Sequence, residues 1–295
     1  MINRPLYDRM KAQGKAVVSL TVAEQLSWVR QEDLERIKRF RLMDDVFLTK
    51  CFEKDTACTQ LVLRIILNKP DLIVLDVHTQ VFVANLLKRA VRLDIVATDS
   101  ENRRINVEVQ REDKGAGKRR ARYNASMMDS GLLEKGKDFD ELPEVYVIFI
   151  TENDVLGQDK PLYQIERCIL ETGEVFDDGS HILYVNGAYR DETPLGKLMH
   201  DFACSEPAQM YYDELSERVK FFKESKEGVI TMCKILEEVE AQGLERGRQE
   251  GRQEGRQETM FDTAKRMLLT GKYAIEEIVD ISGLPLEEVL KLKQA

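Results

Sequence analysis

The apolar run EVYVIFIT at residues 144–151 is the segment that most constrains the fold of this chain. A strand with two apolar faces has to be buried on both sides, as happens inside a sheet that helices cover from above and below. Segments with helical apolar spacing lie on either side of it, at residues 42–68 and 117–136. This combination predicts an α/β fold with helices packed on a central sheet.

Four other segments have the composition of strands, with β-branched residues or strict alternation. They cover residues 72–80, 89–99, 103–111 and 181–187. The order of elements is helix, strands, helix, strand, strand, which indicates a mixed sheet. Residues 1–40 are expected to be polar and helical, with a capping box at residues 21–24 (TVAE).

The two consecutive strands within residues 92–113 (RLDIVATDSENRRINVEVQRED) carry the candidate chemistry. Alternation places Glu108 and Gln110 on one face of the second strand and apolar residues on the other. If residues 97–104 form a turn, the strands pair as a hairpin and Asp94 approaches Glu108 across it. Two neighbouring carboxylates are hard oxygen ligands that suit Mg²⁺ or Mn²⁺. The alternative is a pair of acids on a solvated sheet face.

A basic stretch follows this hairpin directly. Residues 114–122 (KGAGKRRAR) hold five basic residues among nine and no acid. Cations beside an acidic metal site are suited to binding a phosphodiester backbone, although a solvated charge run at a helix start is the alternative. The candidate DNA-binding residues are Lys114, Lys118, Arg119, Arg120, Arg122 and Tyr123.

Composition limits the choice of function and location. The net charge of −9 argues against attraction of the whole surface to nucleic acid, so a DNA-binding protein of this composition needs a local basic patch. The five cysteines form no CxxC pair, and the N-terminus has no apolar core of a secretory signal, which together predict a cytoplasmic protein with reduced thiols. No apolar run of membrane-spanning length is present. His78 and His200 are interpreted as structural residues, with a general base as the alternative.

The C-terminal third is expected to be helical and to contain a repeat. Residues 247–258 read GRQE three times over. Glycine at every fourth position weakens a helix, which favours a solvated linker or frayed helix. The alternative is close helix–helix contact through the glycines, and hence a homo-oligomer. The tail at residues 259–295 has the outline of a helix-turn-helix, but Glu287 and Glu288 would repel phosphates, so a small interaction module is the preferred interpretation.

Several blocks in order resemble one known family. They are the Asp94…Glu108-x-Gln110 pattern with its basic helix and Tyr123, FRLMDDVFLTKCF at residues 40–52, LPEVYVIFITENDV at residues 142–155, and DGSHILYVNGAY at residues 178–189. Together they resemble the PD-(D/E)XK nuclease family transposases of bacteria, also called recombination-promoting nucleases. The resemblance covers roughly residues 40–240, and the glycine-repeat tail is also typical of the family.

The resemblance implies a restriction-endonuclease-like core, in which helices flank a central mixed β-sheet, with a helical C-terminal extension. The implied activity is Mg²⁺- or Mn²⁺-dependent DNA endonuclease chemistry linked to recombination or transposition. The alternative is a weak or inactive nuclease-fold protein that acts as a DNA-binding or protein-interaction module. The expected divisions are an N-terminal helical segment at 1–40, the nuclease-like core at 41–192, a helical region at 193–242, the repeat at 243–258 and the tail module at 259–295.

The resemblance also assigns roles to individual residues. Asp94 and Glu108 are implied to bind the metal, and Gln110 occupies the position of the lysine found in most of the superfamily. This family commonly carries glutamine there. A further acid from the first core helix is implied to approach the metal, and both Asp45 and Glu53 are candidates.

Overall fold

The computed structural model describes residues 29–84, 90–111, 113–133 and 136–294. The expected capping box at residues 21–24 lies outside this part of the chain. Internal contacts divide the chain into two compact units, residues 1–233 and 234–295, and each is described by itself.

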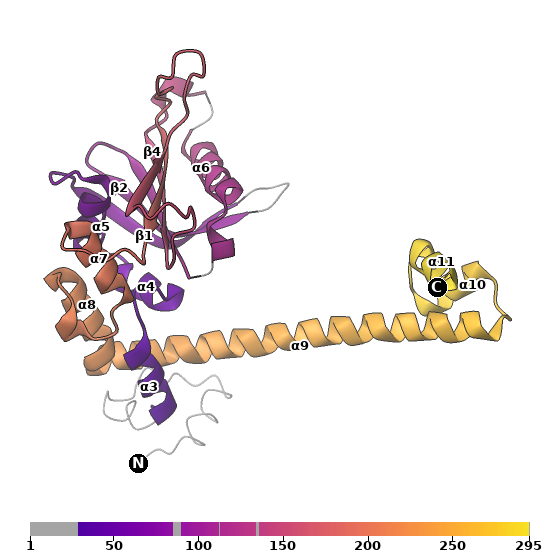
Figure 1. The fold of residues 1–295 in the computed structure, drawn as a ribbon. Helices are drawn as coiled ribbons and strands as arrows, with labels where there is room; N and C mark the ends of the chain where they lie inside the picture. Colours follow the sequence, from indigo (N-terminus) through magenta and orange to yellow (C-terminus); the bar gives the residue numbers. More distant parts are fainter. Residues whose placement is uncertain (1–28, 85–89, 112, 134–135, 295) are drawn as a thin grey trace. The chain divides into compact units, whose positions relative to one another are not determined.

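The first unit is built on one six-stranded mixed sheet (Figure 1). Its strands lie in the order β1-β2-β3-β4-β6-β5. The β1–β2, β2–β3 and β5–β6 pairs are antiparallel, whereas β3–β4 and β4–β6 are parallel. The strand bounds are β1 Val74–Val83, β2 Val91–Asp99, β3 Arg104–Gln110, β4 Val145–Thr151, β5 Leu162–Ile165 and β6 Ser180–Asn186. The predicted mixed α/β fold is therefore confirmed.

Helices lie on both sides of this sheet (Figure 1). Helix α6 packs on strands β1, β2, β4 and β6, while α4 and α5 pack on the β1–β2 end from the other side. Short 3₁₀ turns η2, η3 and η4 occur at Asp113–Ala116, Phe139–Glu141 and Pro207–Gln209. The helices of this unit are α3 Gln31–Arg39, α4 Asp45–Phe52, α5 Thr56–Leu67, α6 Lys118–Leu132, α7 Pro194–Ala203 and α8 Asp213–Glu224.

Strand β4 is the centre of the core, as its sequence predicts. All seven of its residues are buried. Phe149 stacks on Tyr184 of β6, with ring centroids 5.4 Å apart, on the face that α6 covers. Glu108 of β3 is the register partner of Phe149, so the face that carries Glu108 also lies under α6. This register directs the start of α6 toward the candidate site.

Strand β5 is an element that the sequence patterns did not predict. It has four residues, lies at the edge of the sheet and pairs only with β6 among the described strands. Two of its residues are exposed and two are half-buried, so it carries no strong apolar pattern. Its conformation depends on pairing with β6, which a local pattern does not reveal.

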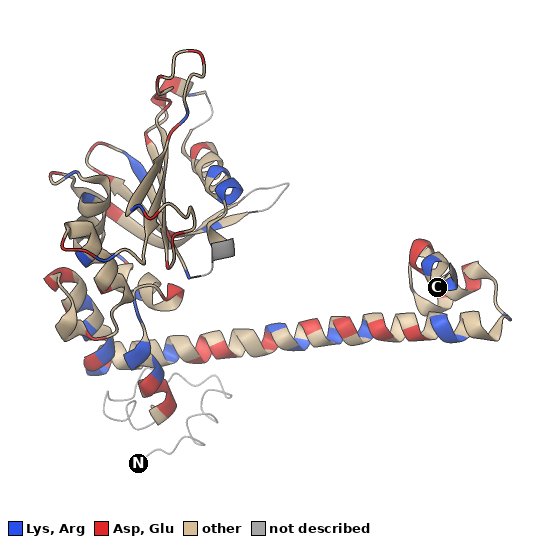
Figure 2. Cartoon of the chain, in the orientation of Figure 1, with Lys and Arg blue, Asp and Glu red and all other residues tan. Residues whose placement is uncertain are grey.

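The second unit is helical. Helix α9, Lys226–Thr270, begins in the first unit and runs through the whole glycine repeat, followed by α10 Ile275–Ser282 and α11 Leu286–Gln294. Gly271 and Gly283 adopt the left-handed conformation at the two breaks between these helices. The ends of the three helices share a small core of Ala264, Met267, Ile278, Leu284 and Val289. Figure 2 shows acidic and basic residues alternating along α9.

None of the described helices combines the length and apolar character needed to cross a bilayer.

Candidate active site

The two predicted acids meet where strands β2 and β3 stop pairing. The last paired residues on this side are Ile95 and Val107. Asp94 directly precedes Ile95, and Glu108 directly follows Val107. Beyond this point, hydrogen bonds from backbone amides to side chains replace the backbone hydrogen bonds between the two strands. The Asp94 amide donates to Glu108 Oε1 at 3.3 Å, and the Val109 amide donates to Asp94 Oδ2 at 3.3 Å. The diverging strands thus hold both carboxylates in fixed positions.

Glu108 is a fully buried carboxylate with two side-chain donors. Asn106 Nδ2 donates to its Oε1 at 3.1 Å, and Arg120 Nη2 donates to its Oε2 at 2.6 Å. Burial raises the pKa of Glu108, while the positive charge of Arg120 opposes that rise. Arg120 comes from the first turn of α6, and its guanidinium also lies 5.8 Å from the centre of the Phe149 ring. The sheet register described above explains this contact.

Asp94 is buried, 8% exposed, and no described cation forms an ion pair with it. Burial raises the pKa of its carboxyl group, and the negative charges of Glu108 and then Asp45 raise it further. The positive charge of Arg120 lowers that pKa, but its effect is the smallest of these influences. The pair of acids is therefore short of positive charge in the absence of a bound cation.

Asp45, and not Glu53, is the acid of helix α4 that reaches the site. Asp45 lies at the first position of the helix and lines the same pocket as Asp94. Gln80 Nε2 donates to its Oδ1 at 3.1 Å. Glu53 lies beyond the other end of α4 and pairs with Lys50 at 2.5 Å. The two candidate acids therefore lie at opposite ends of helix α4, and only Asp45 lines the pocket.

Gln110 lies beside the acids, at the end of β3. Its Oε1 accepts from Arg120 Nη1 at 3.3 Å, and the same nitrogen donates to the carbonyl oxygen of Gly115 at 3.0 Å. A Cβ atom on Gly115 would lie 1.9 Å from Gln110 Oε1. Because glycine has no side chain, position 115 leaves space for the Gln110 amide.

Asp45, Asp94, Gln110 and Arg120 line a pocket of about 330 Å³, whereas Glu108 is not among the residues that line it. It opens to solvent and is lined by Met43, Asp45, Asp94, Val109, Gln110, Arg111, Gly115 and Arg120. Mg²⁺ and Mn²⁺ prefer hard oxygen donors such as these carboxylates, and Arg120 pairs with Glu108 but not with Asp94, so this donor set fits such an ion. Within the described ranges, no three histidine, cysteine, aspartate or glutamate side chains are grouped as a metal site, so the fit rests on the buried Asp94–Glu108 pair.

The predicted DNA-binding residues divide into two groups. Arg120 turns toward the acids, whereas Lys118, Arg119 and Arg122 are exposed along the start of α6, where Figure 2 shows basic residues. Tyr123 is half-buried on the same helix. The side chain of Lys114 lies outside the described part of the chain. The exposed group is thus placed next to the pocket without lining it.

The sequence patterns did not identify Asn106 or the ion-pair network beside the pocket. Asn106 is fully buried and orients Glu108. Its position on the same strand face as Glu108, two residues earlier, is the signal that could have indicated it. In the network, Arg111 pairs with Asp44 at 2.7 Å, and Arg41 pairs with Glu152 at 2.8 Å. These pairs join residues 67 and 111 positions apart, and no local pattern predicts such contacts.

Neither predicted structural histidine lines the pocket. His78 pairs with Asp76 at 2.7 Å, and His200 pairs with Asp201 at 3.0 Å.

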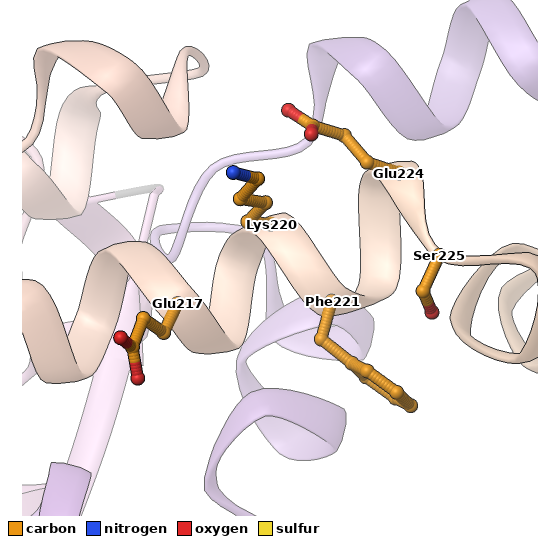
Figure 3. A pocket seen from close by; sticks show the side chains of 5 residues that line it. All are labelled: Glu217, Lys220, Phe221, Glu224 and Ser225. Atoms are coloured by element: carbon orange, nitrogen blue, oxygen red, sulfur yellow. The ribbon is translucent and has the colours of Figure 1, made fainter.

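Another pocket, of about 410 Å³, lies along α8. Figure 3 shows its side chains fanning outward, with Phe221 pointing away from Lys220 and Glu224. They converge on no common point, so we assign no ligand to this surface.

A mixed sheet that carries two buried acids beside diverging strands, with cations at the next helix, defines a nuclease-like α/β protein. The family model described as PD-(D/E)XK nuclease family transposase matches residues 66–190, so this core segment is similar to that family, as its motifs indicated. No curated protein and no solved structure matches the chain significantly.

Proposed function

We propose that this protein is a metal-dependent DNA endonuclease that hydrolyses phosphodiester bonds in the bacterial cytoplasm, in DNA recombination or transposition. The observation that carries the proposal is the buried Asp94–Glu108 pair, which meets at the divergence of β2 and β3 and is short of positive charge. The family match to residues 66–190 supports nuclease-like chemistry.

In this proposal, Asp94 and Glu108 hold Mg²⁺ or Mn²⁺, and Asp45 contributes from the edge of the pocket. The bound ion would polarise the phosphodiester and lower the pKa of a bound water. The protein's own part is to keep the acids fixed. The amide of Val109 holds Asp94, while Asn106 and the amide of Asp94 hold Glu108.

Gln110 and Arg120 have separate roles in this proposal. Gln110 is neutral, so its amide orients a water or donates to a phosphate oxygen without supplying the charge of a lysine. Arg120 supplies a positive charge next to Gln110 and is suited to binding a phosphate through its planar guanidinium. Cleavage is therefore expected to be slower than in a lysine-containing site, but present.

The Asp94→Asn variant tests this function, because it keeps the shape of the side chain and removes its charge. Titration with Mn²⁺ should show the loss of metal binding, and supercoiled plasmid should no longer be nicked. Asp140→Asn, an exposed aspartate, serves as the control. Unchanged nicking by the Asp94 variant would exclude this pocket as the source of activity.

One contact favours the alternative, a catalytically weak or inactive nuclease fold that binds DNA or protein. Arg120 already places a cation 2.6 Å from Glu108. If this ion pair persists when DNA and Mg²⁺ are both present, Glu108 is neutralised without a metal. Retained DNA binding with neither Mn²⁺ binding nor nicking in the unmodified protein would support this alternative.

A further inference from the structure

Next to the candidate active site lies a pocket that none of the sequence motifs indicated. Its volume is about 280 Å³, and we refer to it as the arginine pocket. Its lining residues come from the end of α3, the start of α4 and the end of β3, and they are Arg36, Arg39, Phe40, Arg41, Asp44 and Arg111. Arg111 also lines the pocket that holds Asp94, so the two pockets share a wall.

Two acids hold two of the four guanidinium groups of this pocket in place, those of Arg41 and Arg111. Arg111 Nη1 donates to Asp44 Oδ1 at 2.7 Å, and its Nε lies 3.5 Å from Glu152 Oε2. Arg41 Nη1 donates to Glu152 Oε1 at 2.8 Å. The amide of Arg41 also donates to Asp44 Oδ2 at 2.8 Å. Groups fixed in this way lose little conformational freedom when they bind a ligand, so the pocket is preorganised.

The charges of the pocket favour an anion. Four arginines are present against the two acids of the network, Asp44 and Glu152. Arg39, the last residue of α3, is exposed and forms no ion pair with the described acids. Planar guanidinium groups bind phosphate oxygens in pairs, which makes arginine well suited to phosphodiesters.

The aromatic residue of the pocket is already engaged in the protein core. The ring of Phe40 stacks on Phe47, with centroids 5.5 Å apart and an interplanar angle of 11°. One face of the Phe40 ring is therefore covered by Phe47. Recognition in this pocket rests on charge and points to a phosphate of the backbone, not to a base.

We propose that the arginine pocket binds a backbone phosphate of the DNA strand whose neighbouring phosphate lies at the acids. The identity of the ligand rests on the proposed nuclease function. Gln110, at the end of β3, is followed directly by Arg111, and Asp44 and Asp45 are consecutive at the start of α4, so the two pockets adjoin and a single strand is expected to span both. The exposed cations of α6 lie on a different element and do not line the arginine pocket.

Arg39→Ala tests the proposal, with Lys38→Ala as the matched control. Both residues are exposed cations in the last turn of α3, but Lys38 does not line the pocket. Binding of a short DNA duplex is measured without divalent ions, over a range of salt concentrations, so that the result does not depend on cleavage. The loss of one phosphate contact makes the plot of log association constant against log salt concentration less steep, by about 0.9. It therefore weakens binding about eightfold at 0.1 M salt relative to 1 M.

We expect this change for Arg39→Ala and a smaller, non-specific change for Lys38→Ala. Equal effects of the two variants, or none, would overturn the proposal. Inorganic phosphate at millimolar concentration should not displace the duplex. Binding of inorganic phosphate to the unmodified protein but not to Arg39→Ala, with duplex binding the same in both, would mean that the pocket binds free phosphate and that the proposed DNA contact is wrong.

The cleavage assay separates this proposal from the proposed function. If the protein cleaves DNA, Arg39→Ala should raise KM and leave kcat within about twofold, because the residue does not touch the reacting atoms. If the protein does not cleave DNA, the binding comparison still decides whether the arginine pocket contacts the backbone.

Discussion

At Asp94 a carboxylate is held in a buried position without a cation partner among the described residues. Its raised pKa means that the charged form is less favourable in the folded chain than in the unfolded chain. Ionisation of Asp94 therefore costs stability in the metal-free protein, starting above the ordinary aspartate pKa of about 3.9. In cation-binding sites, this loss of stability in the metal-free protein is offset when the ion binds.

We predict that Asp94→Asn stabilises the metal-free protein. The variant removes the charge that becomes less favourable as pH rises, so its melting temperature should exceed that of the unmodified protein at pH 8 and approach it at pH 4. The amide of Val109 keeps its acceptor in the asparagine side chain. Thermal unfolding in the presence of EDTA measures the effect, and the exposed Asp140→Asn serves as control. A lower melting temperature at pH 8 would show that the charged carboxylate is already well compensated.

A second prediction at this scale concerns Gln110. Gln110→Ala should lower kcat by about 10- to 100-fold, since a positioning group is lost. Gln110→Lys should raise kcat, because it adds a positive charge beside the attacking water. Single-turnover cleavage measures both. If the alanine variant cleaves as fast as the unmodified protein, Gln110 has no role in the reaction.

Gly115 provides an independent test of the same position. A methyl group there would overlap Gln110 Oε1, and the flexible end of the glutamine can move away at little cost in stability. Gly115→Ala should therefore reduce kcat toward the value of Gln110→Ala while the melting temperature changes little. Gly117→Ala, where a Cβ atom meets nothing within 4 Å, is the control. Unchanged kcat in Gly115→Ala would mean that the position of the Gln110 amide does not matter.

At the scale of single elements, strand register decides which side chains meet. The β3–β4 register places Glu108 beside Phe149, and the core under α6 includes Phe149 together with Ala121, Ala125 and Met128. Small residues on α6 allow the helix to approach the sheet closely. The first turn of the helix then lies near enough for Arg120 to reach Glu108. One register thus sets both the packing and the electrostatics of the site.

Helix α9 is the element in which local propensity and observed structure differ most. It remains helical through the glycine repeat, and Cβ atoms on Gly247, Gly251 and Gly255 would meet nothing within 4 Å. Neither interpretation of the repeat, a solvated segment or a surface for self-association, is decided by a single chain. Since there is space for a Cβ atom at each glycine, alanine substitutions can distinguish the two interpretations.

We predict that replacing the three glycines with alanine stabilises the helix by about 1 kcal/mol per position. The intensity of the far-ultraviolet circular dichroism at 222 nm should rise and persist to higher temperature. Sedimentation velocity of the same variant separates the interpretations. An unchanged sedimentation coefficient fits a solvated helix, whereas dissociation of an oligomer would show that the glycines form a contact between copies.

At the scale of the whole molecule, the chain has two units with separate cores. The core of the second unit is small and depends on a few fully buried side chains, among them Val289. Burial of a charge in such a core costs several kcal/mol, which is comparable with the stability of a small helical unit. Damage to the second unit should therefore leave the first unit folded.

We predict that Val289→Asp unfolds the second unit and leaves plasmid nicking intact. Limited proteolysis should remove residues beyond about 233 from this variant first. The neighbouring Leu290, which is 41% exposed, gives the control Leu290→Asp, for which cleavage should match the unmodified protein. Loss of nicking in Val289→Asp alone would show that the second unit is required for the activity of the first.

The sequence alone determined the α/β class, the buried central strand, the hairpin that carries Asp94 and Glu108, and the similarity of the core to one nuclease family. These features follow from periodicity and apolar composition, which act over a few neighbouring residues. Only the tertiary structure decided that Asp45 and not Glu53 lines the pocket, that Arg120 reaches Glu108, that β5 joins the sheet, and that four arginines form a second pocket. The physical reason is that these contacts join distant segments, and their positions depend on strand register and helix packing, which no local pattern specifies.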